Sequence, residues 1–365
     1  MKIAAPFDCV EEVVPLIRAG AEELYCGVWA EHWRQRNIFS NARHMFYSNL
    51  KDFHQLRSAV KIAASQRVAV FVCMNDYYSQ GTLSLAWRDI QEAADAGVAG
   101  FIITDITLLH SMKRLAPQCR FVLSSLNPCF NSAMVALCRQ LGITRIVLPL
   151  SQLSLEEMEG LVTNIHSQGM EAEAFVNNGT VCKNVTGFCQ FHRWGYRHLF
   201  PSKNRRRYSP ALSAIRRIST LLPEGIRTRL GQQLWSTAWG YVQDLVFPCR
   251  QEYSLDIQRR SAAGNIPVER KSRVCLEREF ARQYCILCAV DTFVKWGTDI
   301  GKVGGRGSIL AHKLRDVRLA RQLIATAQQK SGSTEEFEKA GRDLYYQAYG
   351  VTCANKRCYH NGQRE

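Results

Sequence analysis

Short apolar segments alternate with amphipathic helical segments along most of the chain, and this alternation limits the fold more than any other feature. Segments such as FIIT (101–104) and RIVLPL (145–150) are nearly continuous apolar runs, typical of parallel strands buried on both faces. Glycines follow several helical patterns at the place of a C-cap, directly before the next strand. We expect strands at Lys2–Pro6, Glu23–Val28, Arg67–Asn75, Ala99–Asp105, Arg120–Leu126, Arg145–Leu150, Glu171–Asn177 and Ile300–Gly304.

Helical patterns separate these strands. One of them opens with Ser-Leu-Glu-Glu, where Ser154 and Glu157 can each accept the other's backbone N–H. Eight strands alternating with helices favour a closed barrel over an open sheet. The sequence therefore predicts an α/β fold, a TIM-like (β/α)8 barrel with a basic insertion after strand 7 and a short C-terminal extension. We expect helices at Cys9–Ala19, Leu50–Ser65, Leu83–Ala96, Asn131–Leu141, Ser154–Ser167, Cys285–Trp296 and about Ser308–Lys330.

The strand and helix pattern divides the chain into four parts. Residues 1–189 carry strands 1–7, and residues 190–284 interrupt the pattern as an insertion or subdomain. Residues 285–330 supply the closing strand and helix of the barrel. Residues 331–365 form a C-terminal extension that begins with a short helix.

Cationic and aromatic side chains are interleaved in the 190–284 insertion, and the whole chain carries a formal charge of +15. Cations bind phosphates and aromatic rings stack on bases, so this composition favours RNA as a partner. A solvated basic helix or a surface for a partner protein would explain the same segment. The candidate nucleic-acid-binding residues are Arg193, Arg205, Arg206, Arg207, Arg216 and Arg217.

No apolar run approaches the roughly 18 residues of a membrane span, and the N-terminus lacks the pattern of a secretory signal. We therefore predict a cytoplasmic protein without a membrane span. The chain has 14 cysteines, which stay reduced in the cytosol and serve there as metal ligands or as small buried side chains. We interpret six of them as core packing: Cys9, Cys26, Cys73, Cys119, Cys129 and Cys138.

Four cysteines are expected near the barrel mouth, where the loops after the strands build active sites. Cys182 and Cys189 follow strand 7, Cys249 follows the basic residues of the insertion, and Cys285 opens the stretch that leads to strand 8. Four thiolates can hold an iron–sulfur cluster, whereas structural zinc sites usually show paired C-x2–4-C knuckles. In this half of the barrel only Cys285 and Cys288 have that spacing. Spacing alone leaves a cluster, a zinc site and unligated thiols open.

The segment EAFVNNGTVCKNVTGFC resembles the signature of the peptidase U32 family, whose elements match Glu173, Phe175, Gly179, Cys182, Gly187 and Cys189. CRQEY at Cys249 is similar to the family's third cysteine followed by Arg and an aromatic residue. GTDIGKVGGR resembles a GVDSLKIEGR-like family element and puts Lys302 and Arg306 in matching positions, with Cys285 in the place of the fourth cysteine. The stretch from Leu126 to Met158 is also similar, so the resemblance covers most of residues 1–310.

The resemblance implies a 4Fe-4S cluster on Cys182, Cys189, Cys249 and Cys285. It also implies oxygen-independent hydroxylation of RNA bases or of ubiquinone precursors, with prephenate as the oxygen donor and a homologous U32 partner protein in some members. The family name implies a peptidase, some members being collagenase-like, but a cluster saturated by thiolates offers no activated nucleophile. We expect modification of RNA bases, with a ubiquinone-precursor hydroxylase component or a U32-type peptidase as alternatives.

The sequence departs from the family pattern by one extra residue between Phe175 and Cys182 and by Asn177–Asn178 in place of the usual His. The candidate substrate- or anion-binding residues lie in predicted strand 8 or in segments that follow a predicted strand: Arg43, Asn127, Lys302 and Arg306. Arg306 belongs to the loop GGRGS, whose backbone N–H groups could hold a phosphate or carboxylate. The structural alternatives are a surface arginine, a turn-forming asparagine, a rim lysine and a tight turn. No motif assigns a catalytic residue.

Overall fold

The computed structural model describes residues 1–35, 48–149, 153–177, 179–182, 252–257, 269–275, 281–329, 334–350 and 352–353. At residues 34–35 and in the described segments between 179 and 284, the description covers the backbone alone.

Eight parallel strands close into a barrel in the order β1-β2-β3-β4-β5-β6-β7-β12, and β12 pairs with β1 to complete it. All eight strands were predicted from apolar runs, and each is confirmed within a few residues. The strands are β1 (Lys2–Pro6), β2 (Glu23–Cys26), β3 (Ala69–Met74), β4 (Gly100–Ile103), β5 (Arg120–Leu123), β6 (Arg145–Val147), β7 (Glu171–Phe175) and β12 (Ile300–Lys302).

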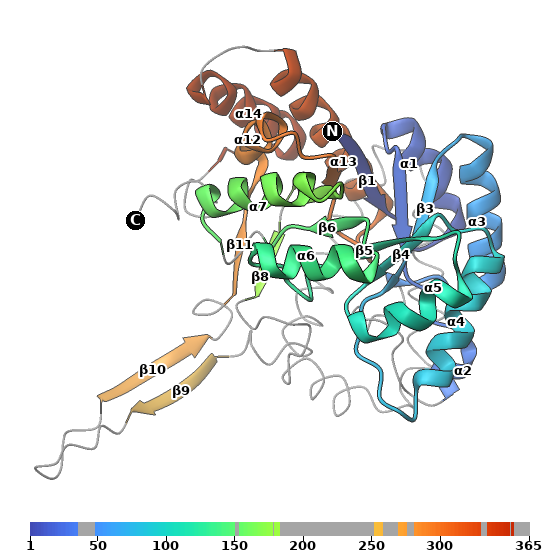
Figure 1. Ribbon diagram of the computed structural model, residues 1–365. Helices are drawn as coiled ribbons and strands as arrows, with labels where there is room; N and C mark the ends of the chain where they lie inside the picture. The colour runs from blue at the N-terminus through green and yellow to red at the C-terminus, as the bar shows by residue number, and fades with distance from the viewer. Residues whose placement is uncertain are drawn as a thin grey trace, which may run out of the picture.

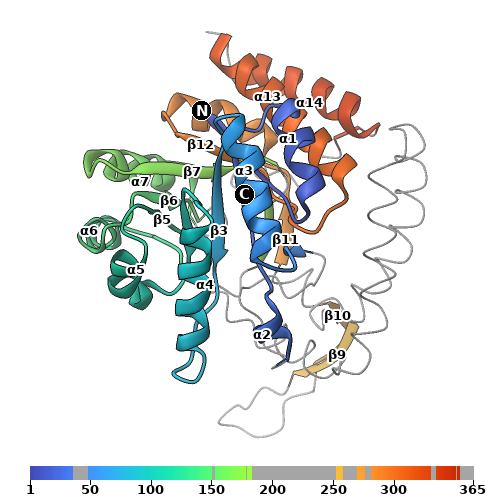
Figure 2. The ribbon, with the colours of Figure 1, turned by 90° about the vertical axis from the view of Figure 1, so that its right-hand side faces the viewer.

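Helices follow the strands and cover the outside of the barrel (Figures 1 and 2). The predicted helices are confirmed, whereas α2 and α5 were not predicted. The helices are α1 (Val13–Ala19), α2 (Glu31–Gln35), α3 (Phe53–Ser65), α4 (Leu83–Asp95), α5 (Leu109–Leu115), α6 (Ser132–Leu141), α7 (Leu155–Ser167), α12 (Val290–Lys295), α13 (Leu310–Gln329) and α14 (Thr334–Tyr349). Helix α14 packs against α13, on the side away from the barrel.

Local sequence signals determine where these helices begin and end. Ser154 and Glu157 form the predicted capping box at the start of α7. Asn131 caps α6 through a hydrogen bond from the Met134 N–H, and Gly142 ends that helix with φ of 81°. The positive φ favours glycine because a Cβ would be strained there. These signals lie within a few residues in the chain, which is why they could be read from the sequence.

The apolar core has two parts. The larger part lies between the strands and the surrounding helices and includes Leu24, Phe101 and Ile146. The smaller part fills the barrel interior with Tyr25, Phe71 and their neighbours. The interior is therefore packed with side chains, as expected for this fold.

Two antiparallel ribbons accompany the barrel in the region where the sequence predicted an insertion. In one, β8 (Gly179–Cys182) pairs with β11 (Ala281–Tyr284). In the other, β9 (Glu252–Ile257) pairs with β10 (Glu269–Cys275) and lies apart from the barrel in Figure 1. Neither ribbon was predicted. The first brings the segment after β7 beside the segment that leads to β12.

Among the described helices, none combines the length and the hydropathy that crossing a bilayer requires.

Candidate functional site

The loops at the carboxyl ends of the strands carry a group of polar side chains. Asp8 follows β1, Thr104 and Asp105 follow β4, Ser124 follows β5, and Asn177 follows β7; all are buried. In (β/α)8 barrels this end builds the binding site. The mouth is therefore the candidate site.

A buried ionic network connects this mouth to the barrel interior. Lys302 donates a hydrogen bond from Nζ to Glu173 at 2.5 Å, and Arg145 donates to the same carboxylate at 3.2 Å. Arg145 also donates to Glu23 at 2.7 and 2.9 Å and to Glu171 at 2.7 Å. Glu173 and Lys302, both matched to family motifs, are thus an ion pair across neighbouring strands.

The charges of this network determine the protonation of its carboxylate. Burial alone would raise the pKa of Glu173, but the charges of Lys302 and Arg145 outweigh it, and the pKa lies below its usual value. Lys302 also lies 4.2 Å above the Tyr25 ring, a favourable cation–π distance. The network keeps Glu173 ionised and holds Lys302 in place, so an anionic ligand would compete with Glu173 for this ammonium.

Arg306 lies in the loop between β12 and α13, at the carboxyl end of β12. The Gly304 N–H donates to Asn177 Oδ1 at 2.8 Å, and the Gly307 N–H donates to Asp8 Oδ2 at 2.9 Å. These two N–H groups already have protein acceptors, which fits the tight-turn alternative for the loop. The Arg306 side chain is buried and acts electrostatically on Cys26 at the end of β2. Anion binding by Arg306 stays a prediction.

Asn127 has a structural role in the described geometry. Its side-chain Nδ2 donates to the Thr104 carbonyl at 2.9 Å, and its backbone N–H donates to the Ser124 carbonyl at 2.9 Å. These bonds join the loops after β4 and β5, as the turn-forming alternative requires. Substrate contact by Asn127 is untested.

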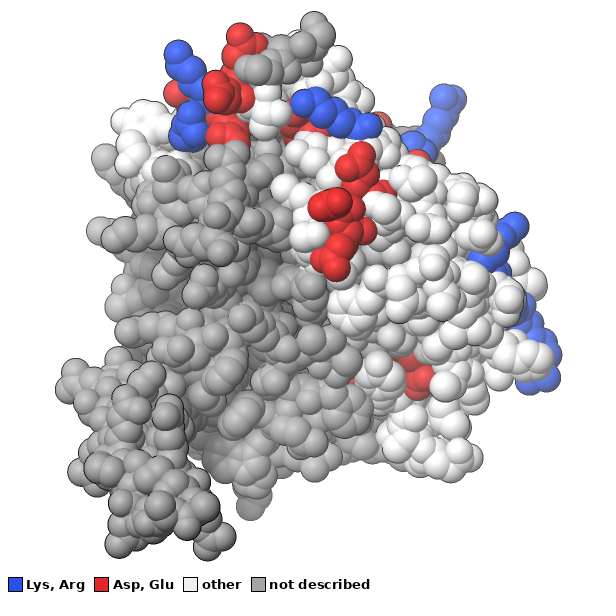
Figure 3. Space-filling view, turned by 60° about the vertical axis from the view of Figure 1, so that its left-hand side comes forward, with Lys and Arg blue, Asp and Glu red and all other residues white. Residues whose placement is uncertain are grey.

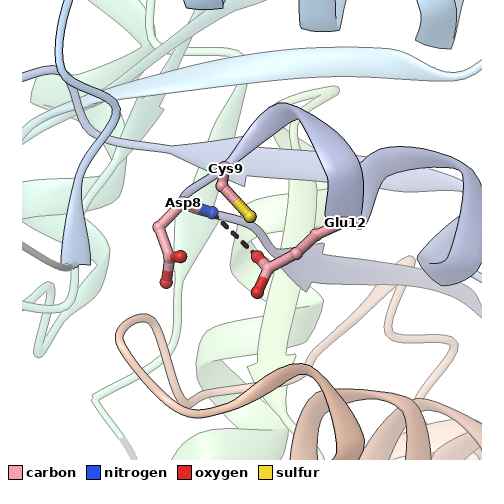
Figure 4. A group of neighbouring side chains, drawn as sticks. All are labelled: Asp8, Cys9 and Glu12. Carbon is pink, nitrogen blue, oxygen red and sulfur yellow. Dashed lines mark hydrogen bonds between the residues drawn. The ribbon is translucent and has the colours of Figure 1, made fainter. Parts of the chain in front are cut away.

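A second charged cluster lies beside the mouth, after β1. Lys313 on α13 donates to Asp8 and Glu12, both at 2.7 Å, and all three side chains are fully buried. In the described part of the chain, Asp8, Cys9 and Glu12 are the group whose ligand atoms all lie within 4.8 Å of one another (Figure 4). The Lys313 ammonium pairs with both acids and offsets one of their two negative charges. The cluster therefore fastens α13 to the loop after β1.

The thiol of Cys9 is not activated by this cluster. Burial, together with the neighbouring Glu12, raises the pKa of the Cys9 thiol. Burial also raises the pKa of Glu12, and the charge of Lys313 offsets only part of this rise. The other predicted packing cysteines, Cys26, Cys73, Cys119, Cys129 and Cys138, are buried as expected. Burial raises the pKa of Cys129 to about 11 and of Cys138 to about 12, so these thiols stay protonated.

The β8–β11 ribbon carries one predicted cluster cysteine and leads directly into another. Cys182 lies opposite Ala281, and Cys285 follows Tyr284, which lies opposite Gly179. Four residues, about 14 Å of strand, therefore separate the levels of Cys182 and Cys285 along the ribbon. The side chain of Cys182 lies outside the described side chains, so the four-cysteine ligand set stays a prediction.

Other predicted site residues lie outside the described residues. They are Cys189, Cys249, Arg43 and the six candidate nucleic-acid-binding arginines, Arg193, Arg205, Arg206, Arg207, Arg216 and Arg217.

The sequence analysis did not identify the buried ion pairs of Glu23, Arg145 and Lys313. A signal was present, because ELYC and EAEAF place acids inside strands that are otherwise apolar. Buried acids in parallel strands require cationic partners. The partners could not be named, because Glu23 and Arg145 are 122 residues apart in the chain.

The topology and the location of the polar residues define a (β/α)8-barrel protein with its candidate site at the carboxyl ends of the strands. The family model for peptidase family U32 matches residues 9–198, more than half of the chain. The chain therefore belongs to peptidase family U32, as the cysteine motif predicted.

Two curated relatives match the chain. It is 22% identical over 214 residues to tRNA hydroxylation protein P1 of Bacillus subtilis (strain 168), covering 53% of this chain and 46% of that protein. It is 26% identical over 170 residues to tRNA hydroxylation protein P of Escherichia coli (strain K12), covering 47% of this chain and 34% of that protein. The chain thus spans less than half the length of each relative.

Solved structures resemble part of the chain. The U32 peptidase Mk0906 matches with 14% identity and a TM-score of 0.37, over 48% of this chain and 69% of that chain. The aldolase QR15 matches with 13% identity and a TM-score of 0.33, over 48% of this chain and 78% of that chain.

Proposed function

We propose that this chain acts in the hydroxylation of RNA bases, with tRNA as the substrate class. The observation that carries the proposal is that both curated relatives are named tRNA hydroxylation proteins. The chain belongs to peptidase family U32, whose model matches residues 9–198. The ubiquinone-precursor alternative has no comparable observation in its favour.

The charge of the chain supports a polyanionic substrate. The formal charge is +15, and cationic side chains bind phosphates. On the face drawn in Figure 3, the described Lys and Arg side chains stand apart, and the acidic side chains gather in a strip between them. The coloured part of this face therefore has no continuous basic surface. The proposal assigns RNA binding to the arginines between 193 and 217, which lie outside the described residues.

The proposed cofactor is a 4Fe-4S cluster with Cys182, Cys189, Cys249 and Cys285 as its predicted ligands. The pairing of β8 with β11 supports the proposal to the extent that it joins the segment carrying Cys182 to the segment leading to Cys285. When bound, such a cluster would supply electron-transfer or Lewis-acid chemistry. The proposal does not require a particular arrangement of the four thiolates.

Hydroxylation replaces a C–H bond of the base with C–OH, so one oxygen atom must come from a donor that is left with one oxygen fewer. The proposed donor, prephenate, carries carboxylates. Arg306 at the mouth is the candidate partner for a carboxylate because a guanidinium can bind it through two parallel hydrogen bonds. The Lys302–Glu173 pair supports the floor of the mouth and positions the strand from which the Arg306 loop departs.

Nucleoside mass spectrometry tests the proposed function. tRNA from a strain lacking the chain should lack a hydroxylated nucleoside that the intact gene restores. A Cys182→Ser variant should not restore it, whereas Cys138→Ser, at a buried packing thiol on α6, should. Identical nucleosides in all strains would contradict the proposal. A loss of ubiquinone with unchanged tRNA would instead favour the alternative.

A further inference from the structure

The loop between β12 and α13 depends on side chains outside it for its conformation. Gly305 and Gly307 have positive φ angles of 107° and 92°, and glycine has more conformational freedom than any other residue. Asp8, after β1, accepts the Gly307 N–H at 2.9 Å. Asn177, after β7, accepts the Gly304 N–H at 2.8 Å. These two side chains therefore anchor a glycine-rich loop at both of its ends.

Asp316, in the second turn of α13, determines how the Asn177 side chain is oriented. Its Oδ2 accepts a hydrogen bond from Asn177 Nδ2 at 3.3 Å, and Nδ2 also lies 3.4 Å from the Gly304 carbonyl oxygen. A carboxylate can only accept, so it must face the donor end of the amide. The acceptor end, Oδ1, is then left for the Gly304 N–H. Because Asn177 is 4% exposed, water competes little for these groups.

Tyr349, the last residue of α14, holds the other oxygen of Asp316. The Tyr349 hydroxyl donates to Asp316 Oδ1 at 2.9 Å, and Arg315 Nε donates to the same oxygen at 3.1 Å. Two neighbours fix the tyrosine ring. The Arg315 guanidinium lies 4.0 Å from its centroid, and the Tyr345 ring stacks on it at 4.6 Å. The hydroxyl is therefore held in the direction of Asp316.

Antiparallel packing of α14 on α13 brings Tyr349 to this place. Helix α13 starts soon after the loop, and α14 runs back along it. A methyl group on Gly341 would lie 3.8 Å from Leu323, and about two turns further along α14 Tyr349 reaches Asp316. The end of α14 therefore lies beside the start of α13, next to the mouth, although this helix belongs to the predicted C-terminal extension.

We propose that Tyr349 is a positioning residue of the mouth, which acts through Asp316 and Asn177 on the loop between β12 and α13. Without the Tyr349 hydroxyl, one of the hydrogen bonds that hold Asp316 is lost, and the side chains of Asp316 and Asn177 can turn. The loop then takes up more conformations, and Arg306 is less often placed to bind a carboxylate. The inference rests on the proposed function for the role of Arg306, and it adds a part for α14.

Amide hydrogen exchange of the full chain, followed by NMR, tests the proposal. The Gly304 amide reports on the Asn177 anchor, while the neighbouring Val303 amide donates to the Ala4 carbonyl of β1 and serves as the internal reference. In Tyr349→Phe, which keeps the ring and its stacking, exchange at Gly304 should be roughly 2- to 30-fold faster, with Val303 unchanged. Equal acceleration at both amides, or none at either, would overturn the proposal.

Two further variants show whether the effect takes the proposed route. Tyr346→Phe removes a hydroxyl from the same helix at a residue that is 54% exposed, and its exchange should match the wild type. Asp316→Ala should itself accelerate exchange at Gly304, and Tyr349→Phe should then add nothing, because the partner of its hydroxyl is gone. Additive effects of Asp316→Ala and Tyr349→Phe would contradict a route through Asp316.

The nucleoside assay separates this inference from the proposed function. The inference predicts slower restoration of the hydroxylated nucleoside by Tyr349→Phe and wild-type restoration by Tyr346→Phe. If Tyr349→Phe restores it as fast as the wild type, the inference fails and the proposed function stands. If deletion of the chain leaves tRNA unchanged while the exchange pattern is as predicted, the proposed function fails and Tyr349 keeps its positioning role.

Discussion

Replacement of Arg145 with methionine should destabilise the barrel by several kcal/mol. Arg145 donates four hydrogen bonds, to Glu23, Glu171 and Glu173, at 2.7 to 3.2 Å. Its side chain is 2% exposed, and those of Glu23 and Glu173 are 5% and 1% exposed. Methionine approximates the volume of the arginine stem but removes the two closest donors to Glu23 and leaves Glu173 with Lys302 as its cationic partner.

The cost follows from the burial of those carboxylates. Removing one partner of a buried ion pair costs about 3–5 kcal/mol, because the remaining charge has no compensation. Arg120 provides a matched control, since it contacts two of the same acids at 3.5 and 3.6 Å but is 39% exposed. Exposed pairs contribute about 0–1 kcal/mol. Arg120→Met should therefore cost much less than Arg145→Met.

Urea denaturation followed by circular dichroism measures both losses, and pH adds a further criterion. In the wild type, the pKa of Glu173 is lower in the folded protein than in the unfolded chain, where it is about 4.3. Its contribution to stability is therefore fully present above about pH 4.3 and is lost as the pH falls through the pKa of the folded state. In Arg145→Met, Glu173 loses one of the two cations that lower its pKa, so its folded pKa should move upward. The difference in stability between the two proteins should shrink as the pH falls through these folded pKa values. Equal losses in Arg120→Met and Arg145→Met, or a difference independent of pH, would refute this reasoning.

Three further predictions concern other parts of the chain. Lys313→Met should lower the free energy of unfolding, measured by urea denaturation, by about 3–5 kcal/mol, because Asp8 and Glu12 stay fully buried without their cation. As a control, replacement of the exposed Arg321, which pairs with Glu22, should lower it by less than about 1 kcal/mol. Ser154→Ala should cost about 0.5–2 kcal/mol by removing the capping box of α7, and an unchanged urea midpoint would show that the cap is dispensable. Replacement of Arg205, Arg206 and Arg207 with glutamine should reduce the salt slope of tRNA binding by about 2, and a wild-type slope would remove these residues from the RNA site.

The barrel could be predicted because its signals are local. Nearly continuous apolar runs such as FIIT identify buried parallel strands, and Asn131 and Gly142 mark the two ends of α6 within a few residues. The small helix α5 was missed because only seven residues carry its pattern. The closed order of the strands then follows from their number and alternation with helices.

The contacts within the site could not be predicted in the same way. Lys313 lies about 300 residues from Asp8 and Glu12, and only closure of the barrel brings them together. The β8–β11 register, which separates Cys182 from Cys285, is set by strand pairing between segments about a hundred residues apart. Sequence identified the chemistry of these residues but not their partners.

The central claim is that thiolates of this chain hold an iron–sulfur centre that supports hydroxylation of RNA. Iron and acid-labile sulfide, counted per chain in the anaerobically purified wild-type protein together with its visible absorption, test it most directly. The account predicts bound iron and sulfide in similar amounts and a chromophore that air bleaches. A colourless protein that contains zinc and no iron would contradict it.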